Sequence, residues 1–170
     1  RPHAVKKQPI PKPGSKEKHV LEIGGIFDRT VAKALKKALE PLWEGIFLDG
    51  SWGFRPKRGT WPMLAELEAR MIRLDRWVIC IDDIRRAFDN TRVDDVLDAH
   101  QRMFASELKG TVAPAAQGRL LGFIAAVTQG ADPDRQIGIS QGNPFSPLAL
   151  NAVMHYAHDM RLLDNLERPV

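Results

Sequence analysis

The sequence predicts an α+β fold in which several amphipathic helices accompany a small amount of strand. Apolar residues recur at three- and four-residue spacing over 28–42, 91–104, 115–128 and 146–164, which is the spacing of one helix face. A short continuous apolar run over 77–81 is instead typical of a buried strand. Hydrophobic residues make up 44% of the 170 residues and charged residues 27%, a composition that argues against wholesale disorder.

The first 19 residues are basic and are interrupted by several prolines and a glycine. Proline removes a backbone donor and clashes with the preceding helical turn, so this segment is predicted to be extended rather than helical. A turn is expected at 13–15. Composition alone leaves open that the segment is a solvated tail, although its charge also suits a polyanionic partner.

Two helices are expected to follow the N-terminal segment. In the first, over 28–42, Asp28 is a plausible cap and Pro41 comes at the end. The second is suggested over 60–74, where proline sits near the start and apolar residues repeat at helical spacing. Residues 50–59 between them are too rich in glycine and proline for either regular structure.

The single cysteine, Cys80, lies inside the apolar run over 77–81. One cysteine cannot form an internal disulfide or a zinc cluster, so a buried strand cysteine in a reducing, cytoplasmic compartment is expected. No apolar run approaches the roughly 20 residues that span a bilayer, and no membrane partner is predicted. The chain opens at Arg1 rather than Met, which suggests a piece of a longer protein.

Two acids, Asp82 and Asp83, directly follow the expected strand. A buried carboxylate is costly unless it is paired or binds a metal. Because strand side chains alternate, the two should point to opposite sides, and one of them should face an internal site. Mg²⁺ takes one or two carboxylates together with substrate phosphates. Aspartates at a strand end also serve as caps or exposed turn residues, and that alternative stays open.

A glycine-punctuated segment over 138–147 leads into the last expected helix. Glycine lets the backbone approach a ligand closely, and Gln141 offers a donor and an acceptor beside it. Ser146 and Pro147 are typical of a helix start. The alternative is a plain loop.

Five sequence blocks occur in a fixed order along almost the whole chain. Asp-Ile-x-x-x-Phe-Asp at 83–89 and Gln-Gly-Asn-Pro-x-Ser-Pro at 141–147 resemble the first two palm motifs of reverse transcriptases. The basic stretch at 10–18 resembles the fingers hairpin of group II intron and related bacterial enzymes, and 28–31 and 51–56 are similar to the next two blocks. The sequence is therefore identified as resembling bacterial reverse transcriptases, most closely those of group II introns.

The resemblance implies the fingers and palm of a right-hand polymerase, with a small antiparallel sheet packed against helices. It divides the chain into fingers (1–75), a palm strand with the first metal-binding aspartate and its helix (76–110), a helical connection (111–137), and the glutamine-glycine motif with a palm helix (138–170). The second acidic palm motif, Tyr-x-Asp-Asp, and the thumb are not found in the sequence. A missing segment or a partner protein is expected to supply them.

In this family the aspartate before the isoleucine binds both catalytic Mg²⁺ ions, which implies a catalytic and metal-binding role for Asp83 beside the carbonyl of Ile84. Phe88 matches the ring under the sugar that excludes a 2′-hydroxyl. The nucleotide-binding set implied by the resemblance is Lys12, Lys18, His19, Arg86, Ala87, Phe88, Gln141 and Gly142. The residues suited to template or primer phosphates are Arg29, Lys33, Arg55, Lys57 and Arg58, for which a solvated face is the alternative.

The implied function is Mg²⁺-dependent, RNA-directed DNA synthesis with an RNA template, a DNA primer and deoxynucleoside triphosphates. Because the two-metal site needs residues outside this chain, the fragment alone is expected to be inactive. A non-catalytic reverse-transcriptase-like scaffold that binds RNA is the alternative, favoured by His19, Glu22 and Gly24, which depart from the family pattern. An RNA-binding module of unrelated fold is the third hypothesis and rests on charge alone.

Overall fold

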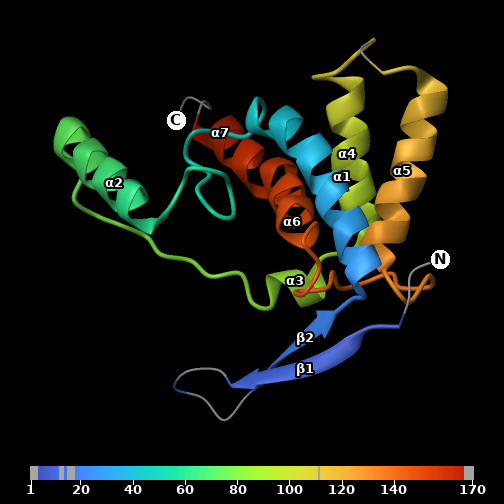
Figure 1. Cartoon of the computed structure of the whole chain (residues 1–170). Coiled ribbons are helices and arrows are strands. Elements are labelled where there is room, and N and C mark those ends of the chain that lie inside the picture. The colour runs from blue at the N-terminus through green and yellow to red at the C-terminus, as the bar shows by residue number, and fades with distance from the viewer. Residues whose placement is uncertain (1–3, 12–13, 15–17, 111, 167–170) are drawn as a thin grey trace.

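The structure is mainly helical, with one small hairpin at its edge (Figure 1). This computed structural model describes residues 4–11, 14, 18–110 and 112–166. No helix in these ranges is long and apolar enough to cross a membrane. The elements, in chain order, are β1 Lys6–Pro11, β2 Lys18–Ile23, α1 Ile26–Glu44, α2 Thr60–Leu74, α3 Ala87–Asn90, α4 Val93–Ala105, α5 Pro114–Gln129, α6 Ser146–Met154, the π-helical turn η1 His155–Asp159, and α7 Met160–Leu166.

The basic, proline-rich segment is extended, as predicted, and it forms an antiparallel hairpin of the kind that the resemblance implied. Lys6 of β1 pairs with Ile23 of β2, and Pro11 pairs with Lys18. Proline is tolerated because each strand of a two-stranded sheet has an edge on which no donor is needed. Most of the turn that was expected at 13–15 lies outside the described residues.

The core lies among α1, α4, α5 and α6, where α1 and α4 each contact both α5 and α6. Its largest fully buried apolar side chains include Trp43, Phe104, Phe145, Met103 and Ile124. Burial of each such side chain stabilises the fold by about 1.5–3 kcal/mol relative to exposure. The helical periodicity of the sequence therefore marked the right elements.

The helix boundaries differ in detail from the expectation. Helix α1 begins one turn early, after Gly25, so Asp28 lies in its first turn rather than at its cap. It also continues past Pro41 to Glu44. The last helix is interrupted by η1, where the hydrogen-bond register widens over one turn.

Two buried polar rings sit inside this core. Trp43 contacts His100 edge to face, with ring centroids 5.3 Å apart. His100 Nδ1 lies 2.7 Å from the carbonyl oxygen of Val96, which it contacts as a donor in the neutral tautomer. Its Nε2 has no hydrogen-bond partner among the described residues, and neither does Nε1 of Trp43. A proton added to Nε2 of His100 would therefore be buried without an acceptor.

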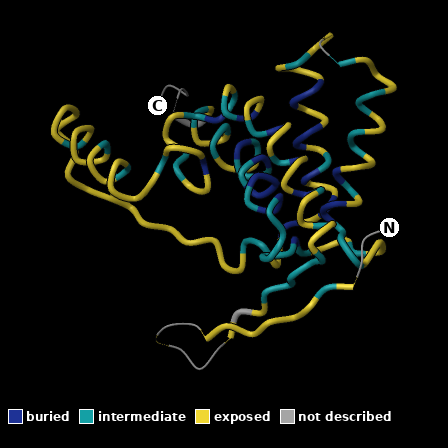
Figure 2. The backbone as a smooth tube through the Cα atoms, in the orientation of Figure 1, coloured by how far each residue is buried: buried dark blue, intermediate teal, exposed yellow. Residues whose placement is uncertain are grey.

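The strand expected over 77–81 is wrong. This segment is irregular, Val78 and Ile81 are 90% and 89% exposed, and Cys80 is exposed rather than buried. A strand needs a neighbour that pairs with its backbone, and the only sheet among the described residues is the β1–β2 hairpin. Figure 2 shows the resulting exposed stretch between α2 and α3. Helix α2 forms as predicted but buries none of its residues.

Candidate nucleotide and metal site

The two motifs that the resemblance placed in one active site lie side by side. The amide of Ile139 donates to the carbonyl of Phe88 at 2.8 Å, and the amide of Gly138 donates to the carbonyl of Thr91 at 2.8 Å. These bonds pair the start of the glutamine-glycine segment with the end of the Asp-Ile-x-x-x-Phe-Asp segment. The fold therefore joins the two blocks through their backbones.

Two backbone conformations shape this junction. Gly138 has a φ of +88°, and a Cβ there would lie 3.4 Å from the carbonyl oxygen of Asp89, so glycine suits both the angle and the close approach. Arg86 has a φ of 50° just before α3, a left-handed conformation that costs a non-glycine residue roughly 1 kcal/mol or more. Such strain tends to occur at functional sites, and here it turns the chain sharply at the position implied for triphosphate contact.

The ring of Phe88 is held by the loop before α2. It meets Phe54 edge to face, with ring centroids 6.0 Å apart, and is half-buried. On the other side of the junction, Gln141 Nε2 lies 3.5 Å from Asp89 Oδ1. The structure thus brings Phe88 and Gln141 to the same region, whereas Ala87 lies half-buried at the start of α3.

Asp83 stands apart from this arrangement. It is exposed in an irregular segment, as are Asp82 and Ile84. No group of three or more acids, histidines or cysteines that could hold a metal ion occurs in the described part of the chain. The described donors therefore do not complete a Mg²⁺ site, and Asp83 would need further carboxylates from elsewhere to bind two ions.

Glu22 docks the hairpin onto the loop that carries Gln141. Its carboxylate pairs with Arg135 at 2.8 Å, and its carbonyl accepts from Ser140 Oγ at 3.2 Å. A Cβ on Gly142 would collide with that same carbonyl. Sequence reasoning missed both Glu22 and Arg135 as site-forming residues, because nothing in the local pattern signals a contact between residues 113 positions apart.

The hairpin residues implied for triphosphate binding are only partly described. Lys18 is exposed at the start of β2. Lys12 lies outside the described residues, and so does the side chain of His19. Their nucleotide contacts remain predictions.

Arg55 is not available to nucleic acid, which corrects its predicted role. Its side chain is almost wholly buried and pairs with Glu44 at 3.0 Å. Its Nη1 also donates to the carbonyls of Leu48 and Ser51, both at 2.8 Å, so it holds the loop between α1 and α2 together. Arg58 is similarly engaged with Asp49 in that loop.

We expect Arg55→Ala to lower the free energy of unfolding by about 2–3 kcal/mol, because it leaves two carbonyls and a partly buried carboxylate without their donor. Urea unfolding followed by circular dichroism measures the effect. The neighbouring exposed cation Lys57 is the matched control, since Lys57→Ala should change stability by no more than about 0.5 kcal/mol. Equal stabilities for the two variants would contradict this assignment.

The remaining predicted nucleic-acid contacts lie on exposed surface. Arg29 and Lys33 are one helical turn apart on α1, with Lys37 one turn further on. All three are exposed, and within the described ranges none of their side chains takes part in a hydrogen bond or ion pair. Lys57 is exposed in the loop before α2.

Comparison with known proteins finds relatives that this chain matches over only part of their length. No family model matches the chain. Protein YkfC of Escherichia coli K12 is 28% identical over 90% of this chain, which spans 40% of YkfC. The group II intron-encoded protein LtrA of Lactococcus lactis subsp. cremoris is 34% identical over 52% of this chain, which spans 14% of LtrA. LtrA of strain MG1363 matches equally. Over about half its length, the chain is therefore a partial homologue of a group II intron-encoded protein.

Proposed function

We propose that this chain is the fingers and first part of the palm of an RNA-directed DNA polymerase. The observation that carries the proposal is the backbone pairing of Phe88 and Thr91 with Ile139 and Gly138, which unites two motifs far apart in the sequence. The partial homology to a group II intron-encoded protein supports the same conclusion. The proposed partners are an RNA template, a DNA primer and deoxynucleoside triphosphates.

In the proposed reaction, the primer 3′-hydroxyl attacks the α-phosphate of a deoxynucleotide and displaces pyrophosphate. The ring of Phe88 would lie against the sugar and leave no room for a 2′-hydroxyl. Arg86 has a positive φ, and the turn there would direct the backbone of Arg86 and Ala87 toward the phosphates, while Lys12 and Lys18 would add positive charge. Gln141 would contact the nucleotide from the facing segment.

Asp83 would supply one carboxylate to Mg²⁺, which neutralises charge on the phosphates when bound. We infer that the other carboxylates come from a further palm segment or a partner protein. The observation behind this inference is the exposed apolar segment over 77–81, which ends at Asp82 and Asp83 and has no strand neighbour among the described residues. The 170 residues alone are accordingly expected to extend primers very little.

A non-catalytic RNA-binding scaffold is the second candidate. The observation that favours it is the structural use of Glu22, which departs from the family pattern and is committed to Arg135 rather than to a ligand. A scaffold would keep the docking between hairpin and loop without needing Asp83.

Primer extension on an RNA template with Mg²⁺ tests the proposal, with the longest protein that the gene encodes. The wild type should extend with deoxynucleotides, and Asp83→Asn should reduce extension to background because the variant loses a charged metal ligand. Asp82→Asn is the matched control, since it removes a neighbouring exposed charge and should retain activity. If wild type and Asp83→Asn bind RNA equally and neither extends, the scaffold replaces the enzyme.

A further inference from the structure

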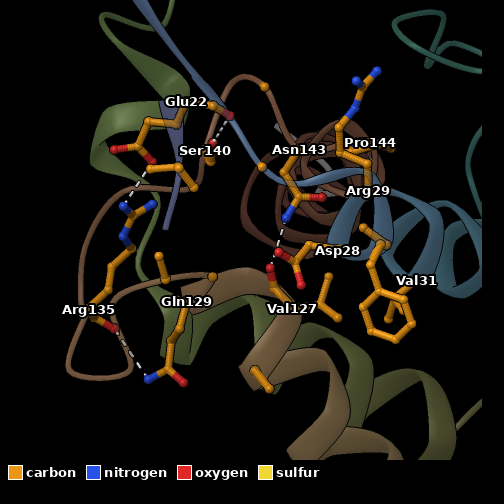
Figure 3. A pocket seen from close by; sticks show the side chains of 18 of the residues that line it. Glu22, Asp28, Arg29, Val31, Val127, Gln129, Arg135, Ser140, Asn143 and Pro144 are labelled. Carbon is orange, nitrogen blue, oxygen red and sulfur yellow. Dashed lines mark hydrogen bonds and ion pairs between the residues drawn. The ribbon is translucent and has the colours of Figure 1, made fainter. Parts of the chain in front are cut away.

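A cavity of about 460 Å³ opens between the start of α1, the end of α5 and the loop that carries Gly142 (Figure 3). Its walls are mainly apolar and include Val31, Ala126 and Val127. Two phenylalanines also line it, Phe27 from α1 and Phe123 from α5, and they are 68% and 42% exposed. Exposed aromatic rings from two helices on one cavity are costly to leave in water unless a ligand covers them.

Some of the charged side chains around the cavity already have partners, whereas Arg29 has none among the described residues. Glu22 and Arg135 neutralise each other across one wall, at 2.8 Å. Asp28, another acid of the lining, already takes part in an interaction. Arg29 stands at the rim, and Figure 3 shows its guanidinium directed outward rather than into the cavity. The net effect is an apolar interior with a cation available at its mouth.

The cation at the mouth begins a stripe along α1. Arg29, Lys33 and Lys37 follow at intervals of four residues, which is a rise of about 6 Å for each step. All three side chains are exposed and have no partner within the described ranges. They are therefore available to a polyanion whose negative charges are regularly spaced. A single-stranded nucleic acid has that form, because each nucleotide carries one phosphate and one flat apolar base.

We propose that the cavity receives an unpaired base of single-stranded RNA. The base stacks on Phe27 and Phe123 while its flanking phosphates follow Arg29, Lys33 and Lys37. Cavities of roughly 300–1,000 Å³ accept ligands larger than one base, so the base enters with its sugar. The identification of the strand as the template rests on the proposed polymerase function, whereas the binding of the strand does not.

Stacking is sequence-tolerant, because every base has a flat face. The site therefore holds the strand in place without selecting its sequence. Glu22 and Gly142 line the cavity as well, so a base inside it contacts the same docking point that connects the hairpin to the Gln141 loop. Through this contact, an occupied cavity would stiffen the junction between the hairpin and the nucleotide site.

Fluorescence anisotropy with a labelled single-stranded RNA of about ten nucleotides tests the proposal on the whole chain. Phe27→Ala and Phe123→Ala should each weaken binding about tenfold. Phe27→Tyr should retain affinity, and Phe27→Leu should behave like Phe27→Ala because it is apolar but cannot stack. Trp61→Ala is the matched control, since Trp61 is an exposed aromatic on α2 outside the cavity. Both phenylalanines are exposed, so thermal melting should show that the variants stay folded.

Two further arms separate stacking from charge. A strand of abasic nucleotides should bind the wild type about tenfold more weakly, and Phe27→Ala should cause no additional loss on it. Arg29→Gln should reduce the slope of log affinity against log salt by about 0.7, whereas Phe27→Ala should leave the slope unchanged. The proposal is overturned if the wild type binds the abasic strand as tightly as it binds RNA. It is also overturned if Phe27→Ala and Phe123→Ala bind RNA as tightly as the wild type does.

This test also separates the cavity from the enzyme. If RNA binding depends on Phe27 but the protein extends no primer, the cavity proposal stands and the polymerase proposal fails. If the wild type extends primers and Phe27→Ala binds RNA as tightly as the wild type, the polymerase proposal stands and the cavity proposal fails. Binding of a small apolar molecule by the cavity, with no effect of Phe27→Ala on RNA, likewise counts against an RNA base as its occupant.

Discussion

Acidification from pH 6.5 to pH 4 is expected to remove about 3 kcal/mol of folding stability through His100. Burial against Trp43 and Phe145 lowers the pKa of His100 from 6.5 to about 4, which the hydrogen bond to Val96 offsets only in part. Between these two values the unfolded chain binds a proton that the folded chain does not. Stability from this group is therefore complete above pH 6.5 and declines as the pH falls toward 4.

His155 acts in the same direction. Burial lowers its pKa, while the nearby carboxylates of Asp159 and Glu107 oppose the shift. Its contribution should be smaller than that of His100, because the two carboxylates beside it favour its protonated form. Together the two histidines make α4 and η1 the acid-sensitive part of the core.

Urea unfolding at pH 7, 5.5 and 4.5 measures this effect. His100→Asn keeps a donor for the Val96 carbonyl and removes the titration, so its stability should depend much less on pH even though its absolute stability is lower. His158→Asn is the control, because it replaces an exposed histidine of the same helical region. The same pH dependence in His100→Asn and wild type would show that another group is responsible.

Gly142→Ala is expected to cost about 2–3 kcal/mol and to release the hairpin from the Gln141 loop. The added Cβ would overlap the carbonyl oxygen of Glu22, which is backbone and cannot turn away as a side chain could. To relieve the overlap, β2 and the loop must separate, and the Ser140 hydrogen bond and the Arg135 ion pair then weaken.

Hydrogen exchange of the β1–β2 amides, together with urea unfolding, measures this loss. Gly122→Ala is the matched control, because Gly122 lies inside α5 with open space around its Cβ position. That substitution should stabilise the protein by roughly 0.5–1 kcal/mol, since alanine favours the helix. A Gly142→Ala protein with wild-type stability and wild-type hairpin protection would contradict the close approach.

The sequence predicted the helices well because their signal is local. Apolar spacing marked α1, α4 and α5, whose buried faces then pack together. It also marked α2, but periodicity shows only that an apolar face exists, and α2 buries none of its residues. The strand over 77–81 failed for the same reason, because an apolar run does not reveal whether a pairing partner is present.

The sequence predicted which motif residues form the candidate site, but not the contacts that hold their segments together. Motif spacing named Phe88 and Gln141, and the backbone pairing of their segments agrees with that grouping. Glu22 and Arg135 carried no signal, because their ion pair depends on how distant segments meet. Arg55 was misassigned because a basic residue in a loop looks the same in sequence whether it faces solvent or binds Glu44.

The exposed segment over 77–81 also bears on the tendency of the protein to aggregate. Extended, apolar and unpaired backbone is a template for association with another molecule of the same kind, and flanking charges act as gatekeepers against it. Here the charges that follow are Asp82, Asp83, Arg85 and Arg86. We therefore expect the carboxylate of Asp83 to limit aggregation, and variants that remove it to self-associate at lower concentrations than the wild type.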